Sequence, residues 1–132
     1  MGTRSNIGAR QEDGTIKVIY CHWDGYPEGV GATLAEHYID PVKVAALLNL
    51  GDISSLNDTE VENVESYAKR GETGVEARTY ITQEQWLEDV RDSGVEYLYL
   101  FDKSFTNEFY WGWLSVNNRW HTLEKPKQVA NA

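Results

Sequence analysis

Cysteine is nearly absent from the chain: Cys21 is the single one among 132 residues. No disulfide can therefore form within the chain, and a domain of this length buries enough apolar surface to fold without one. We interpret Cys21 as a buried structural residue, because it follows a strand pattern and stands beside no paired base. Since cytoplasmic proteins keep their thiols reduced, the sequence favours a cytoplasmic protein.

Basic residues are also scarce, with 12 Lys and Arg against 21 Asp and Glu, which gives a net charge of −9. Nucleic acids and anionic membranes need clustered cations, so we expect neither general nucleic-acid binding nor membrane binding. Long apolar runs are missing, and the first six residues lack the apolar segment of a signal peptide. The charge balance still permits a small phosphorylated ligand that a few arginines hold in a pocket.

Catalytic and cofactor motifs are missing too. The serines, such as Ser54, have no visible base to activate them, and nothing singles out two carboxylates for glycoside hydrolysis. His22 and Asp24 stand two residues apart, but a zinc site needs three or four ligands. The sequence thus predicts no catalytic residue, no metal and no cofactor, and it favours a non-enzymatic protein without excluding an enzyme.

Aromatic residues, in contrast, are abundant: five Trp and eight Tyr contribute most of the 12% aromatic content. A core of this size does not need so many large rings. Some of them are therefore expected on a binding surface or at the interface of a homo-oligomer.

The hydrophobic periodicity predicts an α+β fold: a mainly antiparallel sheet with two to four helices packed on it, in a single compact domain over residues 1–124. Residues 125–132 are expected to be a flexible tail. Strands are expected at 5–9, 15–23, 75–80, 95–101 and 108–116, with a last strand around Trp120. The apolar run 95–101 is expected at the centre of the sheet.

Helices are expected after Pro27, at 41–50 and after Thr82, whereas 60–69 could be helical. In the first helix, Val30, Leu34 and Tyr38 recur every four residues and predict a buried stripe. Thr82 followed by Gln85 matches a capping box, which makes the third helix the clearest of the set.

We expect residues 20–31 to form the functional site around which the rest of the fold is arranged. This stretch joins a strand, a turn with three glycines and a helix N-terminus, the kind of junction where backbone N–H groups can face an anion. Asp13-Gly14 predicts a hairpin turn, which would bring Arg4 and Asn6 close to His22 and Trp23.

The candidate ligand-binding residues are Arg4, Ser5, Asn6, His22, Trp23, Asp24, Tyr26, Arg70 and Arg78. The arginines would bind phosphate together with Asn6, because a guanidinium can donate two parallel hydrogen bonds to it. Trp23 and Tyr26 would stack on a base or sugar. His22 and Asp24 would form hydrogen bonds with a base or ribose. The alternatives are that the arginines pair with nearby acids and that Trp23 belongs to the core.

Four segments resemble a family of small uncharacterised bacterial and bacteriophage proteins: GTRSNI from residue 2, HWDGYP from 22, GDISSL from 51 and RGETGVEAR from 70. The family has no established activity, so the resemblance implies a context rather than a mechanism. Phage proteins of this size without catalytic motifs often act by binding, and some sequester the nucleotide signals of bacterial immunity.

The resemblance therefore favours a phage counter-defence protein in the host cytoplasm that sequesters a cyclic nucleotide or an ADP-ribose derivative. Two alternatives stay open. One is a protein–protein inhibitor that presents an acidic surface to a host defence enzyme. The other is a nucleotide-processing enzyme in which His22 or Asp24 acts as general base.

Overall fold

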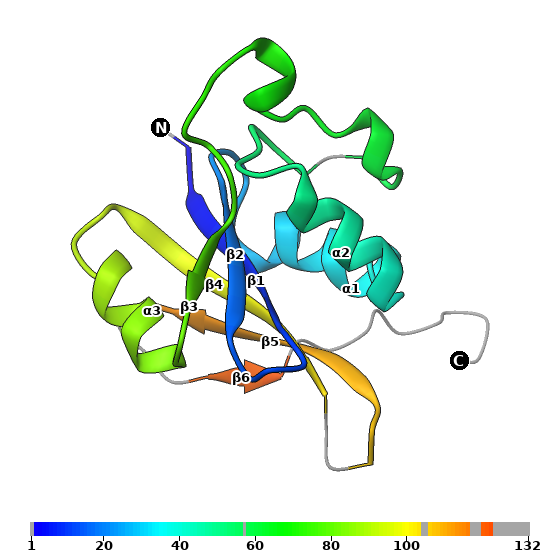
Figure 1. Cartoon of the computed structure of the whole chain (residues 1–132), viewed down its shortest axis with the longest axis vertical. Coiled ribbons are helices and arrows are strands. Elements are labelled where there is room, and N and C mark those ends of the chain that lie inside the picture. Colours follow the sequence, from blue (N-terminus) through cyan, green and yellow to red (C-terminus); the bar gives the residue numbers. More distant parts are fainter. Residues whose placement is uncertain (1, 57, 104–105, 117–119, 123–132) are drawn as a thin grey trace.

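A six-stranded mixed sheet forms the frame of the chain (Figure 1). The computed structural model describes residues 2–56, 58–103, 106–116 and 120–122, so the expected tail at 125–132 lies outside the described residues. The strands are β1 (Arg4–Arg10), β2 (Ile16–Cys21), β3 (Arg78–Tyr80), β4 (Val95–Lys103), β5 (Phe109–Ser115) and β6 (His121–Thr122). Their order in the sheet is β3-β2-β1-β4-β5-β6.

The predicted α+β class is confirmed, and the sheet is mainly but not purely antiparallel. The pair β1 and β4 is parallel, whereas the other neighbouring strands run antiparallel. The two strands at the centre, β1 and β4, carry the longest buried runs. The central position expected for residues 95–101 is thus correct, because such an apolar strand is stable only with both faces covered.

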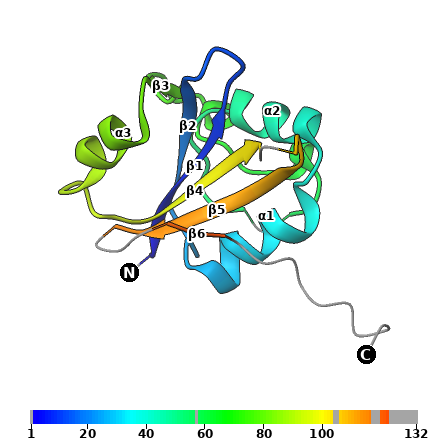
Figure 2. The same ribbon diagram turned by 90° about the horizontal axis from the view of Figure 1, so that it is seen from below.

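Helices cover the two faces of the sheet unequally (Figure 2). The helices α1 (Ala32–His37) and α2 (Pro41–Asn49) lie on one face, and α3 (Gln83–Val90) lies on the other. A π-helical turn, η1 (Pro27–Gly31), leads into α1. Two three-residue 3-10 turns, η2 (Val61–Asn63) and η3 (Ala68–Arg70), interrupt the long connection between α2 and β3.

The α1–α2 face is closed by a continuous apolar core. The expected stripe is confirmed, since Val30, Leu34 and Tyr38 are all buried against the sheet. Asp40 caps α2 by accepting a hydrogen bond from the backbone N–H of Val42 at 2.9 Å. Such a cap satisfies one of the free amides at a helix start and fixes where the helix begins.

The α3 helix packs through Trp86 onto the middle of β1. Thr82 caps the helix, with its Oγ1 accepting from the N–H of Gln85 at 3.0 Å, as predicted. The side chain of Gln85 accepts from Ile81 rather than from Thr82. Trp86 lies over Gly8, where a Cβ atom would come within 3.0 Å of the indole ring. A side chain at position 8 would therefore push α3 away from the sheet.

Three predicted elements are wrong or too long. Residues 60–69 do not form one continuous helix, because the two short 3-10 turns are separated by a segment in which Ser66 forms a single bridge with Ile53. The strand expected at 75–80 begins only at Arg78. The second strand ends at Cys21, since the N–H groups of His22 and Trp23 turn away to the carbonyl of Ser54.

Among the described residues, no helix has both the length and the apolar character needed to cross a membrane.

Candidate functional site

A polar pocket of about 240 Å³ lies on the α3 face, between β2, β3 and the end of α3. Its polar lining comes from separate parts of the chain: Asn6 and Tyr20 on β1 and β2, Asp52 on the connection, Arg78 and Tyr80 on β3, Asp89 on α3, and Ser93 between α3 and β4. Val90 and Val95 supply apolar lining. Two of the predicted ligand-binding residues, Asn6 and Arg78, therefore line one pocket.

Asp52 and Arg78 form a two-pronged ion pair at one side of this pocket. Nη1 of Arg78 donates to Oδ1 of Asp52 at 3.1 Å and Nη2 donates to Oδ2 at 2.9 Å. The carboxylate is 8% exposed and also accepts the backbone N–H of Tyr20 at 2.9 Å. The hydrogen bond with Asp52 raises the pKa of Arg78. The positive charge of Arg78 is thus already matched by an acid within the protein.

Asn6 is fixed by the helix that covers it. Its Oδ1 accepts the indole Nε1–H of Trp86 at 2.9 Å, and its Nδ2 donates to the carbonyl of Ser5 at 3.2 Å. The indole donor identifies which end of the amide is oxygen. Nδ2 carries two hydrogens, so Asn6 keeps one donor for a ligand.

Three rings continue from the pocket toward the surface. Tyr20 Oη and His22 Nδ1 share a hydrogen bond of 2.7 Å, and the rings of His22 and Trp23 meet edge to face at 4.7 Å between centroids. Trp23 is 45% exposed, so the alternative that it belongs to the core is wrong. Its ring packs against Gly2, where a Cβ atom would clash at 2.6 Å. We call Tyr20, His22 and Trp23 the aromatic strip.

Arg4 lies beside the inner end of the aromatic strip. Burial raises the pKa of Tyr20, and the positive charge of Arg4 opposes that shift. The Arg4 guanidinium lies 3.0 Å from where a Cβ of Gly94 would stand, at the start of β4. Within the described part of the chain, Arg4 is exposed and forms no ion pair.

The third predicted arginine, Arg70, does not line the pocket. It lies in η3, where its Nε approaches Oε1 of Glu65 at 3.3 Å and its guanidinium stacks over Tyr67 at 5.2 Å from the ring centre. Of the three arginines predicted to bind phosphate, Arg78 lines the pocket, whereas Arg4 and Arg70 do not. For Arg70 and Arg78, the alternative of pairing with nearby acids is correct.

The glycine-rich turn does not offer its amides to an anion. The N–H groups of Gly29 and Gly31 donate to the carbonyl of Tyr26, and that of Val30 donates to the carbonyl of Asp24. Gly25 donates to the carbonyl of Thr3 at 2.8 Å. The glycine amides expected to face an anion thus have backbone partners instead, because the tight π turn uses them within the protein.

The remaining predicted residues fall outside the pocket. Asp24 has a left-handed backbone (φ 57°) and accepts a hydrogen bond from the exposed Tyr26 at 3.3 Å, so both lie at the tip of the turn. Ser5 is fully buried on the opposite face, under Gly25 and opposite Cys21 in the β1–β2 ladder. Ser5 cannot contact a ligand there, since strand alternation turns it away from Asn6 and the pocket.

Sequence reasoning missed Tyr20, Asp52, Tyr80 and Asp89. Tyr20 could have been found, because it alternates with His22 on the same strand face. Asp52 carries no local signal, since its partner Arg78 is far away in the sequence. Within the part of the chain that the structure describes, no three metal-binding side chains cluster.

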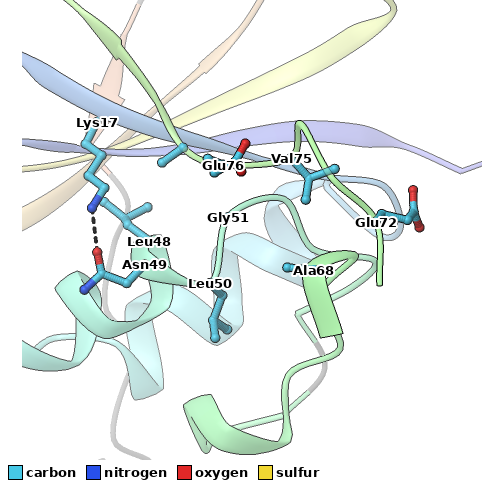
Figure 3. Close-up of a pocket in the computed structure, with 10 residues that line it drawn as sticks. Lys17, Leu48, Asn49, Leu50, Gly51, Ala68, Glu72, Val75 and Glu76 are labelled. Atoms are coloured by element: carbon cyan, nitrogen blue, oxygen red, sulfur yellow. Dashed lines mark hydrogen bonds between the residues drawn. The ribbon is translucent and has the colours of Figure 1, made fainter. Parts of the chain in front are cut away.

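A second pocket of about 350 Å³ lies at the end of α2 and contains none of the predicted residues (Figure 3). Lys17 and Asn49 close one end through a hydrogen bond of 2.6 Å, and Glu72 lies at the other end. Leu48 and Leu50 supply apolar lining. Since Lys17 is held by Asn49 and the rim is acidic, this pocket does not fit a phosphorylated ligand.

In comparisons with known proteins, no family model, no curated protein sequence and no solved structure matches the chain. The site is therefore interpreted from its own geometry.

Proposed function

We propose that the protein binds a small phosphorylated, nucleotide-type ligand on the α3 face and releases it unaltered. The observation that carries this proposal is that Arg4 is exposed and forms no ion pair with any described residue. The other described arginines, Arg10, Arg70, Arg78 and Arg91, each pair with a carboxylate. In a chain with 21 acids, an arginine that has no acidic partner among the described residues and lies beside a polar pocket is suited to an external anion.

The size of the pocket constrains how such a ligand would lie. A volume of about 240 Å³ is below the roughly 300–1,000 Å³ of sites that enclose a drug-sized molecule. The pocket can therefore enclose one ring system, while the rest of the ligand lies outside. The aromatic strip and Arg4 adjoin the pocket and offer a stacking surface and a cation for that outer part.

The biological role that we propose is sequestration of a nucleotide immune signal by a phage protein in the host cytoplasm. The resemblance to bacterial and bacteriophage proteins supports this context. We also propose that the protein self-associates. Ile39, Phe109 and Tyr110 are exposed large apolar residues around one pocket of about 380 Å³, and burying them would favour association.

A thermal-shift screen tests the binding proposal. The panel contains cyclic di- and trinucleotides and ADP-ribose derivatives, and the ligand is examined by chromatography after heat release. A ligand that binds only the folded state raises the melting temperature, by several degrees at about a hundredfold excess over its dissociation constant. The proposal predicts such a shift with the ligand recovered intact.

The matched control compares two exposed arginines. Arg4→Ala should abolish the shift, whereas Arg91→Ala at the end of α3, which removes an exposed pair with Glu88, should leave it unchanged. Recovery of an altered ligand would instead support the nucleotide-processing enzyme. Absence of a shift across the panel would contradict the binding proposal and favour an inhibitor of a host protein.

A further inference from the structure

We propose that the open edge of β3 binds an extended peptide segment of another protein, one that carries lysine or arginine at alternate positions. This inference goes beyond the proposed nucleotide binding and does not rest on it. The surface consists of outward backbone groups of β3, an open groove between β3 and α3, and the acidic side chains around that groove.

The β3 strand ends the sheet on one side, because β2 is its one neighbour in the strand order (Figure 1). The direction of the backbone groups follows from Tyr20 on β2, whose N–H donates to Asp52 and whose carbonyl accepts from Ile53. Tyr20 therefore directs both groups away from β1. In an antiparallel ladder the residues at alternate positions, Val18 and Ile16, do the same and face β3.

Thr79 consequently presents its backbone to the open side of β3. The two β2 residues that face β3 pair with Arg78 and Tyr80, so the N–H and the carbonyl of Thr79, between them, point outward. Within the part of the chain that the structure describes, neither group has a hydrogen-bond partner. The N–H of Ile81, at the end of the strand, is occupied by Oε1 of Gln85. A strand edge with a free donor and a free acceptor is where an added strand pairs.

An open groove of about 600 Å³ lies between this edge and α3. It is lined by Thr79, Tyr80, Gln85, Glu88 and Asp89. Since side chains alternate along a strand, a peptide residue opposite Thr79 would direct its two neighbours to the face of Tyr80, above the groove. A peptide strand thus gains backbone hydrogen bonds at the edge and room for alternate side chains beside α3.

The charge of this region decides the kind of peptide. Residues 76–92 contain five acids and two arginines. Both arginines are paired with acids, Arg78 with Asp52 and Arg91 with Glu88. A lysine or arginine that reaches the groove therefore meets an excess of negative charge, whereas an acidic side chain would be repelled.

A second copy of this chain fits the edge less well than a basic peptide does. A twofold pairing of two β3 strands would bring the same acidic groove of each copy against the other. Like charges that face each other in this way disfavour the pairing. The β3 strand has three residues, which limits the number of backbone bonds, so we expect a reversible complex with a short segment.

The test measures the affinity of labelled peptides by fluorescence anisotropy at low ionic strength. The first peptide alternates lysine with valine, the second has glutamate in place of lysine, and the third is the lysine peptide with N-methylated backbone amides. The wild type should bind the first peptide at least about tenfold more tightly than the other two. The second reverses the charge, and the third cannot donate hydrogen bonds to the edge.

Two variants locate the binding surface. Thr79→Pro removes the outward N–H and keeps the pairing of Arg78 and Tyr80 with β2, since proline is tolerated where an edge N–H faces solvent. It should weaken binding of the lysine peptide by about tenfold. Glu88→Gln should weaken it by about threefold. The matched control is Glu36→Gln, which changes an exposed acid on α1 and should leave the affinity unchanged.

Several results would overturn the proposal. Equal affinity for the lysine and glutamate peptides, or no binding of the lysine peptide, would contradict a basic partner. Undiminished binding of the N-methylated peptide would contradict pairing at the edge, and this result does not depend on whether Thr79→Pro folds, which a circular dichroism melt checks. A dimer in sedimentation that Thr79→Pro dissociates would assign the edge to a second copy. These measurements contain no nucleotide, so their failure leaves the nucleotide proposal standing.

Discussion

The two faces of the sheet are covered to different extents and have different chemistry. On the α1–α2 face, sixteen buried apolar residues of the described part of the chain form one cluster, which includes Ile53 and Val64 from the connection after α2. On the α3 face, the cluster contains nine buried apolar residues among those described, and the short helix α3 covers them. The polar pocket lies where α3 ends and the sheet continues. Incomplete cover on one face therefore leaves room for a site.

The polar groups of the two faces differ in the same way. On the closed face, Ser5 and Cys21 are fully buried, and Oγ of Ser5 has no hydrogen bond of normal geometry within the described residues. On the α3 face, Asp52, Asn6 and Asp89 each have a partner that fixes them. The α3 face thus has oriented polar groups, which is the condition for specific binding.

The largest expected loss of stability comes from removing Trp86, the side chain through which α3 packs on the sheet. Trp86→Ala should lower the free energy of unfolding by about 3–5 kcal/mol, because it leaves a cavity and removes the donor to Asn6. Leu47→Ala, the corresponding change on the closed face, should cost about 2–5 kcal/mol from the cavity alone. Urea denaturation of both variants measures the difference.

Trp86→Phe separates packing from hydrogen bonding. It keeps a ring over Gly8 but leaves Oδ1 of Asn6 without its donor, so it should cost about 1–3 kcal/mol. If Trp86→Phe were as stable as the wild type, the Asn6 contact would have no role in fixing the α3 face.

The next effect concerns the ion pair at the pocket. Arg78→Ala should destabilise the protein more than Asp52→Asn. Arg78→Ala leaves the buried carboxylate of Asp52 with the N–H of Tyr20 as its remaining partner. Asp52→Asn replaces that carboxylate by a neutral amide, whose oxygen can still accept the N–H of Tyr20. Because the Arg78 side chain is 46% exposed, water screens the pair, and both costs should stay below the roughly 3–5 kcal/mol of a fully buried pair. Thermal and urea unfolding of the two variants tests this order, and the reverse order would contradict it.

A smaller effect on stability is expected at alkaline pH from Cys21, which is buried on the closed face. Burial raises the pKa of the Cys21 thiol from 9.0 to about 12. The unfolded chain loses this proton near pH 9 and the folded protein near pH 12. The contribution of the neutral thiol to stability is therefore complete below about pH 9 and is lost as the pH rises toward about 12.

Comparison of the wild type with Cys21→Ala checks this sign. The stability difference between them should be constant up to about pH 8 and should shift against the wild type between about pH 9 and 12. A difference that stays constant over the whole range would show that the thiol is not buried as described.

The smallest effect on stability is expected from Arg4→Ala. Arg4 is exposed and has no acidic partner among the described residues, so the change should fall within about 0.5 kcal/mol. The same variant should lose ligand binding. A large loss of stability would mean that Arg4 supports the fold instead of binding a ligand.

Local sequence patterns predicted the elements that carry their own signal. The stripe of Val30, Leu34 and Tyr38 follows helical periodicity, and the Thr82 cap follows from one short motif. The apolar run 95–101 predicted a central strand because an uninterrupted run must be covered on both faces. These features depend on neighbours close in the sequence, or on burial alone.

The candidate site was harder to predict from the sequence, because the residues that contact each other there are far apart in the chain. Asp52 binds Arg78, which is 26 residues further along the chain. Asp52 also accepts a hydrogen bond from the backbone N–H of Tyr20, 32 residues before it. The exposure of Trp23 depends on the backbone turning toward Ser54, which no local pattern specifies. The glycine amides of the turn, which were expected to face an anion, donate to backbone carbonyls instead, to those of Tyr26 and of Thr3.

The most direct test of the α3-face site uses the tryptophan indole N–H signals in a ¹H–¹⁵N NMR spectrum, titrated with each ligand of the nucleotide panel. Trp86 Nε1 donates to Asn6 in the pocket wall, whereas Trp111 Nε1 donates to the carbonyl of Tyr38 in the closed core. Binding at the pocket should shift the signals of Trp86 and Trp23 and leave that of Trp111 in place. A shift of Trp111 without one of Trp86, or no shift with any ligand of the panel, would contradict a nucleotide site on the α3 face.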